Sequence, residues 1–175
     1  MPKLHDITVP SSLKERLQQG HPWVYRNHVP EHVRLPSGAW VRVRCGNWSG
    51  YGLWDSSSPI AIRIFSERQP PDARWLRERV AAAWALRAPL RAAGCTAFRW
   101  LFGEGDGLPG ITVDRYDEFA VVQTYMDAGP LLDWLPEALQ VVAPLLGLVL
   151  RERSRDEAPG SDERRTTMDE NSTPA

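Results

Sequence analysis

Cysteine is scarce in this sequence, since the 175 residues contain only Cys45 and Cys95. Neither belongs to a CxxC pair or stands at metal-ligand spacing from a histidine, which argues against a disulfide framework and a zinc site. We expect both thiols to be reduced and buried. Long apolar runs are missing as well: VVAPLLGLVL is too short to span a bilayer, and the N-terminal MPKLHDITVPSSLKE lacks the apolar segment of a secretory signal. The sequence therefore predicts a cytoplasmic protein without a membrane segment.

A large net charge is also lacking, because the formal value is −1. The charges are unevenly placed, however. Residues 1–68 carry nine Lys/Arg against five Asp/Glu, whereas residues 69–150 carry seven against ten. A local basic excess is typical of a segment that contacts nucleic acid. The first part of the chain is therefore the candidate for RNA contact.

Motifs for covalent catalysis are missing, and the one nucleotide-binding motif is not followed by the helix that it requires. The sequence contains no GxSxG and no P-loop, so it offers no candidate nucleophile. A GxGxxG pattern does occur inside FGEGDGLPGITVDRY, at Gly105, Gly107 and Gly110. A dinucleotide site requires its last glycine to open a helix, whereas the residues that follow here are β-branched and aromatic. They predict a hairpin about Asp117-Glu118 whose near-alternating residues are Ile111, Val113, Phe119, Val121 and Gln123.

Short strands and one small helix dominate residues 1–68. The stretch SSLKERLQQG predicts a helix capped by Ser11 or Ser12 and ended by Gly20. The segments SGAWVRVRC, GNWSGYGLWD and SPIAIRIFS alternate like strands and are bounded by Gly, Asn or Ser. We predict a small β-barrel-like domain over residues 1–68.

Residues 69–152 combine helices and strands. Asp72 caps a predicted helix whose apolar residues recur at helical spacing, namely Trp75, Leu76, Val80, Ala83 and Leu86. We predict a helical linker over 69–96 and a small α+β domain over 97–152, built from AFRWLF, ITVDRY, FAVVQTY, a helix from about Asp133 to Ala143, and GLVLRE. Apolar residues become rare from Arg151 onward, which predicts a disordered tail over 153–175. The fold class predicted for the whole chain is α+β.

Cations and flat rings lie close together in the first unit, around GHPWVYRN. Such side chains bind phosphates and unstacked RNA bases. A solvated charged surface is the alternative, because charged strand faces are common on small barrels. The acids Glu104, Asp106, Asp114 and Asp117 form a second cluster, but they lack the spacing of a calcium loop. We expect them to face water in a wide glycine turn and to hold no metal.

Two motifs together, LKERLQQGHPWVYRNHV and FGEGDGLPGITVDRYDEFAVVQTY, resemble the bacterial 23S ribosomal RNA (cytosine-C5) methyltransferase family. The intervening GYGLWDSSSPIAIRIFS also fits that family, and the resemblance covers residues 11 to about 154. It implies an N-terminal PUA domain and a central EEHEE-type domain. Members continue into a Rossmann-like domain that binds S-adenosylmethionine (SAM) and carries the catalytic cysteine. This sequence enters a polar segment instead, so we expect a chain truncated before the catalytic domain, with no cofactor of its own.

The resemblance also implies which residues contact RNA. Between the small helix and the adjacent strand edge, we expect the RNA-binding residues Lys14, Arg16, Gly20, His21, Trp23 and Arg26. Arginines would position phosphates, the Gly20 backbone would permit close approach, and His21 would stack or donate a hydrogen bond. The loop residues Glu104, Asp106, Gly107 and Pro109 would help to line a substrate cleft.

Three functions are open at this point. The first is the RNA-binding and substrate-positioning part of a ribosomal RNA methyltransferase, with ribosomal RNA as its partner. The second is a protein-interaction module whose acidic central unit docks a separately encoded methyltransferase domain. The third is a decayed gene product without a selected activity.

Overall fold

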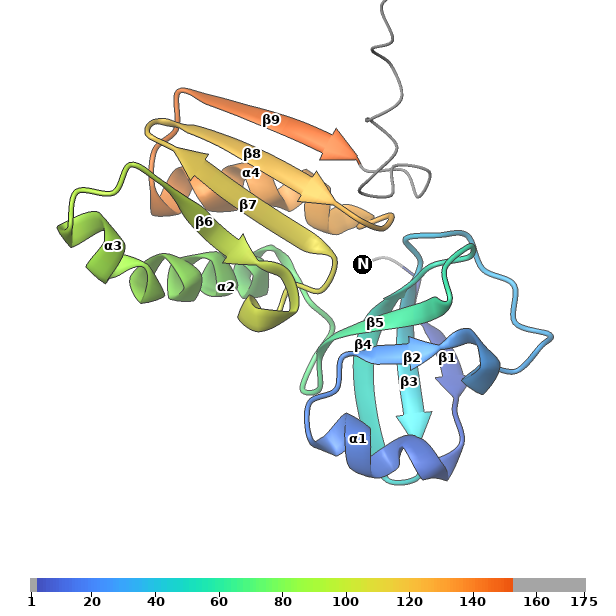
Figure 1. The fold of residues 1–175 in the computed structure, drawn as a ribbon. Coiled ribbons are helices and arrows are strands. Elements are labelled where there is room, and N and C mark those ends of the chain that lie inside the picture. Colours follow the sequence, from blue (N-terminus) through green and yellow to red (C-terminus); the bar gives the residue numbers. More distant parts are fainter. Residues whose placement is uncertain (1–2, 153–175) are drawn as a thin grey trace, which may run out of the picture.

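The first of two sheets is built from residues 3–66. In the computed structural model, which describes residues 3–152, this part of the chain forms β1 (His5–Thr8), the 3-10 turn η1 (Ser11–Leu13), α1 (Lys14–Gln18), β2 (Trp23–Tyr25), the 3-10 turn η2 (Arg26–His28), β3 (Trp40–Cys45), β4 (Trp48–Trp54) and β5 (Ile60–Ser66). The strand order is β1-β3-β4-β5-β2, with β1 parallel to β3 and the other pairs antiparallel. Since β1 and β2 are the edges, the described strands form a curved open sheet, and the predicted barrel is not closed (Figure 1).

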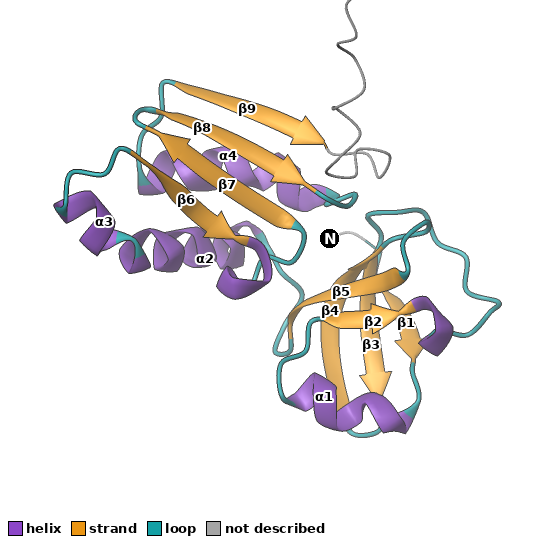
Figure 2. Cartoon of the chain, in the orientation of Figure 1, coloured by secondary structure: helices purple, strands orange, loops and turns teal. Residues whose placement is uncertain are grey.

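Helix α1 covers one end of this sheet (Figure 2). Leu17 is its buried residue and packs in a cluster with Val24, Val41 and Ile62. Gly20 follows the helix with φ +86° and ends it as predicted. The predicted serine cap is wrong, because η1 precedes α1 and neither has a side-chain cap.

The second sheet comes from residues 97–152. It is preceded by α2 (Ala73–Leu86) and α3 (Ala88–Ala92), and consists of β6 (Ala97–Phe102), the 3-10 turn η3 (Gly103–Asp106), β7 (Ile111–Tyr116), β8 (Phe119–Thr124), α4 (Pro130–Val142) and β9 (Gly147–Glu152). The strand order is β6-β7-β8-β9, antiparallel except for β8 with β9. Three strands thus precede the helix, rather than the two of an EEHEE order. The α+β class is confirmed.

Helices α2 and α4 lie on the same face of the second sheet (Figure 1). Asp72 caps α2 as predicted, because its Oδ1 accepts a hydrogen bond from the Trp75 amide at 2.7 Å. Trp75, Leu76, Val80 and Ala83 are buried under the helix, but Leu86 is 69% exposed and is not part of the core. Leu86 is the last residue of α2, next to the break before α3.

The predicted hairpin is present and joins β7 to β8 through Asp117, whose φ is +55°. Its register pairs Tyr116 with Phe119, so residues facing one another share a side of the sheet. Ile111 and Val113 point toward the helices, but in β8 the buried residues are Ala120, Val122 and Thr124. Phe119, Val121 and Gln123, which alternate equally well, lie on the opposite side.

The two cysteines differ in burial. Cys45 is buried, and its thiol donates to the Pro10 carbonyl at 3.2 Å. Burial raises the pKa of that thiol. Cys95 is exposed after α3, so its predicted burial is wrong.

The membrane question concerns helix length and polarity. None of the helices within residues 3–152 is long and apolar enough to cross a bilayer. The tail predicted for residues 153–175 lies outside the residues that the structure describes.

Candidate nucleic-acid interface

The two sheets pack through a shared hydrophobic cluster. Trp40, Leu53 and Phe65 of the first sheet belong to the same buried group as Trp75 and Leu108 of the second unit. The Phe65 ring meets the Trp75 ring edge to face at 6.3 Å between centroids. Buried aromatic contact of this kind fixes the relative position of the two units, so the surface between them is preformed.

Backbone contact reinforces that packing. A Cβ placed on Gly129 would stand 2.8 Å from the Gly38 carbonyl oxygen, and one on Gly38 would stand 2.7 Å from Asp127 Oδ1. Both glycines have positive φ. The Pro36–Ala39 turn of the first unit therefore approaches the start of α4 more closely than any side-chain-bearing residue would allow.

A cleft of about 760 Å³ lies between the units. One wall comes from the end of α1 and from β5, and the other from α2 and the β6–β7 loop. Its lining residues are Leu17, Gly20, His21, Pro22, Ile64, Phe65, Ser66, Glu67, Arg68, Gln69, Trp75, Glu78, Arg79, Glu104, Gly107 and Pro109. The fold thus joins Gly20 and His21, predicted from one motif, to Glu104, Gly107 and Pro109, predicted from the other.

A second, shallower groove continues from the cleft. Arg16, Gln19, Gly20 and His21 line this groove of about 430 Å³, so Gly20 and His21 belong to both depressions. Gly20 has open space where a side chain would stand. An extended chain lying along α1 could therefore pass the Gly20 backbone and enter the cleft. Below, these two depressions together are called the groove–cleft surface.

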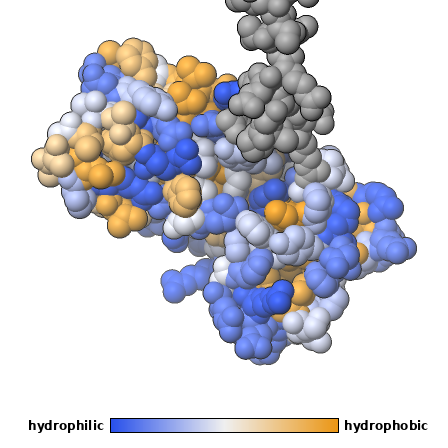
Figure 3. Space-filling model, in the orientation of Figure 1, coloured by the Kyte–Doolittle hydropathy of each residue, from blue (hydrophilic) through white to orange (hydrophobic). Residues whose placement is uncertain are grey.

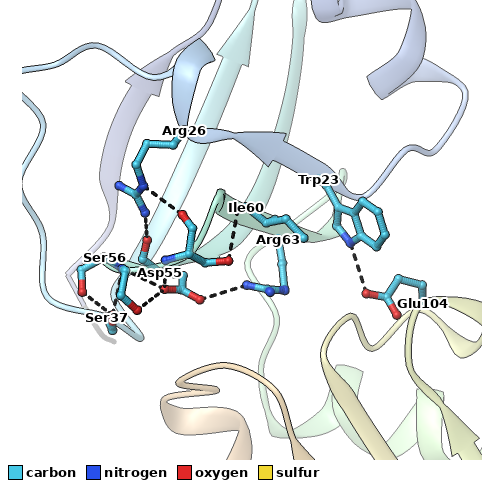
Figure 4. Close-up of polar contacts among 10 residues, drawn as sticks. Trp23, Arg26, Ser37, Asp55, Ser56, Ile60, Arg63 and Glu104 are labelled. Atoms are coloured by element: carbon cyan, nitrogen blue, oxygen red, sulfur yellow. Dashed lines mark hydrogen bonds and ion pairs between the residues drawn. The ribbon is translucent and has the colours of Figure 1, made fainter. Parts of the chain in front are cut away.

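His21, Trp23 and Glu104 link the two walls. The Trp23 amide donates to His21 Nδ1 at 3.2 Å, so the imidazole presents its other nitrogen, Nε2, as the hydrogen-bond donor. The indole Nε1 of Trp23 donates to Glu104 Oε1 at 3.1 Å across the units (Figure 4). The indole of Trp23, which does not itself line the cleft, consequently ties β2 to the β6–β7 loop, and one carboxylate oxygen of Glu104 is already engaged.

Arg26 lies apart from this surface. Its Nε donates to the Ser58 carbonyl at 2.9 Å, and its terminal nitrogen donates to the Asp55 carbonyl (Figure 4). Its guanidinium also stands 5.0 Å from the centre of the Trp54 ring. These contacts fasten it to the β4–β5 connection. Lys14 is also outside the groove–cleft surface, with its side chain beside Gly46 in the β3–β4 turn.

A buried ion pair supports the same connection from the other side. Arg63 Nη1 stands 3.2 Å from Asp55 Oδ2, and both side chains are buried. Burial alone would raise the pKa of Asp55, but hydrogen bonds from the Ser57 and Ser58 amides and the charge of Arg63 lower it overall. The carboxylate stays ionised and rigid. Its role is structural, since it holds the turn that Arg26 also contacts.

The acids of the second motif serve different purposes. The side chain of Asp106 is only 6% exposed; it accepts two hydrogen bonds from Arg87, at 2.8 and 2.6 Å, and a third from the Phe102 backbone amide. The expectation that it faces water is therefore wrong, and Asp106 does not line the cleft. Asp114 pairs with Arg99 on β6. No group of three or more potential metal ligands occurs in residues 3–152.

Two arginines of the cleft were not found from sequence. Arg68 and Arg79 are exposed on its walls, and within residues 3–152 neither forms a salt bridge. The Arg79 guanidinium lies 5.5 Å from the Trp75 ring centre, and its side chain is 3.9 Å from where a Cβ on Gly107 would stand. Because residues four apart on a helix share a face, the sequence could have predicted that Arg79 lies beside Trp75. Arg68 follows β5 and carried no comparable signal.

The GxGxxG loop has the geometry of a turn. Gly103, Gly107 and Gly110 all have positive φ, and β7 follows Gly110 directly. In the β8-α4-β9 crossover, by contrast, a glycine, Gly129, does directly precede a helix, as a nucleotide-binding turn requires. However, Asp127 Oδ1 accepts a hydrogen bond from the Gly129 amide at 3.0 Å, and Gly38 packs on that glycine. Protein groups therefore cover the start of α4, so a phosphate cannot bind there.

Comparison with known proteins identifies the first unit. Residues 7–67 match the PUA-like domain family. The chain is homologous to ribosomal RNA large subunit methyltransferases. It is 35% identical over 156 residues to one from Deinococcus radiodurans, which covers 83% of this chain and 38% of the relative. It is 37% identical over 146 residues to methyltransferase I from Shewanella denitrificans, covering 79% and 36% respectively.

The fold also recurs in solved structures. A protein of Streptococcus mutans described as a SAM-dependent methyltransferase matches with a TM-score of 0.75 at 17% identity, covering 85% of this chain and 41% of that one. A methyltransferase in complex with SAH matches with a TM-score of 0.73 at 18% identity, covering 85% and 40%. The chain thus spans well under half the length of these proteins.

Proposed function

We propose that this chain binds and positions RNA as the substrate-recognition part of a SAM-dependent ribosomal RNA methyltransferase. The observation that carries the proposal is the continuity of the groove and the cleft at Gly20 and His21, where the two sequence motifs meet. Similarity to ribosomal RNA methyltransferases over both units supports RNA as the ligand. An RNA partner also favours action in the cytoplasm.

The cations of the surface suit a single RNA strand. Arg16 lies along the groove, and Arg68 and Arg79 lie in the cleft. Within residues 3–152 none of the three is held in a salt bridge, so each can approach a phosphate without breaking an ion pair. Gly20 permits the strand to approach the backbone. Three phosphate contacts predict modest affinity, in contrast to a strongly basic RNA-binding protein.

The cleft suits an unstacked base. Its volume exceeds that of one nucleotide, and the half-buried ring of His21 offers a flat surface. Glu104 keeps a second carboxylate oxygen that is able to accept from an exocyclic amino group. Lys14, Trp23 and Arg26 would act from outside the ligand by holding α1, the cleft wall and the β4–β5 connection. Asp106 would hold the β6–β7 loop.

Methyl transfer requires groups that this surface does not offer. In the groove–cleft surface there is no thiol, and Cys45 is buried beneath β1 and α1. We propose that SAM and the reactive cysteine belong to the part of the relatives that has no counterpart among residues 3–152, with cytosine C5 as the methylated position. This portion would act in the same chain or as a separate polypeptide.

The test is RNA binding by matched double variants. Arg16→Ala/Arg79→Ala removes two cations of the surface, whereas Arg34→Ala/Arg77→Ala removes two exposed cations elsewhere and has the same net charge. Fluorescence anisotropy with a labelled single-stranded ribosomal RNA fragment should show weaker binding only for the first variant. Equal binding by both double variants would remove the groove–cleft surface from the RNA site. Preference for duplex DNA would also overturn the proposal.

A further inference from the structure

The second sheet has one face without helices. Helices α2 and α4 cover the side formed by Ile111, Val113 and Val122, and the opposite side is open in the part of the chain that the structure describes (Figure 1). Strand register puts Tyr116 next to Phe119, and Val121 next to Val149, on this open side. Phe102 lies on it at the end of β6. We call this side the open sheet face.

Large apolar side chains are unusually exposed there. Phe102, Tyr116, Phe119 and Val149 have 59%, 53%, 55% and 60% of their surface exposed. The Phe119 ring lies across Gly147, where a Cβ would stand 2.9 Å from its Cδ1, so the ring lies flush with the sheet. In Figure 3, hydrophobic groups are interspersed with hydrophilic ones over the region of β6–β9. Clustered exposure of this kind marks an interaction surface.

The charges of the open sheet face favour a protein over RNA as its occupant. At its centre Arg99 is paired with Asp114, which also accepts a hydrogen bond from the side-chain Nε2 of Gln123 at 3.3 Å. Asp117 and Glu118 are exposed at the hairpin beside the aromatic pair. Phosphates would be repelled by these acids, whereas an apolar protein surface with a basic rim would complement them.

We propose that the open sheet face is the docking surface for a SAM-binding methyltransferase domain, linked or separate. This rests on the proposed function, since it presumes that the chain works beside such a domain. The relatives supply the reason for that occupant. The chain spans 38% and 36% of two ribosomal RNA methyltransferases, so most of each relative lies outside the shared part and must pack near it. A standard interface needs a contiguous surface on each partner, and among residues 3–152 helices cover only the opposite side of the second sheet.

The probe is the portion of the Deinococcus radiodurans relative that lies outside its alignment with this chain, produced separately and first shown to bind SAM. Its affinity for the full chain is measured by calorimetry. Tyr116→Ser/Phe119→Ser should weaken binding at least tenfold, and Val149→Asp, which changes one exposed position and leaves the hairpin intact, should do the same. Leu86→Ser is the matched control, because it removes an exposed apolar side chain from α2. It should bind like the unchanged chain.

Several outcomes would overturn the docking proposal. These are no binding of a SAM-competent probe by the unchanged chain, equal binding by the face variants, and equal loss with Leu86→Ser. Loss of RNA binding in the face variants would instead identify RNA as the occupant. If the face variants keep normal RNA affinity while docking is absent, the docking proposal fails alone and the RNA function stands.

Discussion

The salt dependence of RNA binding measures how many cations of the groove–cleft surface contact phosphates. Among residues 3–152, the cations that line it are Arg16, Arg68 and Arg79. For single strands each neutralised phosphate contributes about −0.7 to the slope of log K against log salt, so three contacts give about −2. Affinity should then fall about 20-fold between about 50 and about 200 mM salt.

Removing one cation should change that slope by a predictable step. For Arg79→Ala we expect a slope of about −1.4 and a loss of about sevenfold over the same salt range. Arg26→Ala should leave the slope unchanged, because its guanidinium is engaged with the Ser58 and Asp55 carbonyls. The assay is anisotropy at four or more salt concentrations on variants with verified melting temperatures. An unchanged slope for Arg79→Ala, or a reduced one for Arg26→Ala, would refute the assignment of phosphate contacts.

Three further predictions concern the loop, the unit interface and the cofactor. Asp106→Ala leaves Arg87 buried without its carboxylate partner and should lower the free energy of unfolding by urea by about 3–5 kcal/mol. The control, Glu137→Ala, removes one partner of an exposed ion pair and should lower it by about 1 kcal/mol or less. Equally small losses for both variants would show that the Asp106–Arg87 pair does not stabilise the fold. Gly129→Ala places a Cβ against the Gly38 carbonyl oxygen and should lower the free energy of unfolding by about 2 kcal/mol or more. Gly94 also has positive φ but has open space where a Cβ would stand, so Gly94→Ala should lower it by about 1 kcal/mol. Equal losses would mean that the close contact between the units does not matter. The purified chain should show no saturable micromolar binding of SAM in calorimetry and no transfer of labelled methyl to ribosomal RNA, because its GxGxxG leads into β7 and the start of α4 is covered. Saturable binding would require a cofactor site within this chain.

Local rules predicted much of the fold because the relevant interactions are local. The Asp72 cap, the Gly20 helix end and the Asp117 hairpin each depend on residues within one turn of the chain. Alternation did not predict which residues of β8 face the core, because both alternating sets contain apolar side chains. Contact with α2 and α4 decides which set is buried. The open edge between β1 and β2 likewise depends on strand placement, which periodicity does not encode.

The site was predictable in parts but not as a whole. Each motif supplied one wall, yet their meeting at the cleft depends on packing between Phe65 and Trp75, which are distant from both motifs. Sequence favoured Arg26 because it follows a ring-rich segment, and the structure instead places it against Trp54. Arg68 could not be predicted as a cleft residue, because its place in the cleft depends on packing against α2 rather than on residues next to it in the sequence.

Photo-crosslinking can show whether RNA lies in the cleft between the two units. Single-stranded ribosomal RNA carrying 4-thiouridine is irradiated with the full chain, and crosslinked peptides are mapped by mass spectrometry. We expect crosslinks to the Gly20–Trp23 segment together with crosslinks near Trp75 or Gly107, from the two walls of one cleft. Crosslinks confined to the open sheet face, or to the Arg42 and Arg44 side of the first sheet, would contradict it.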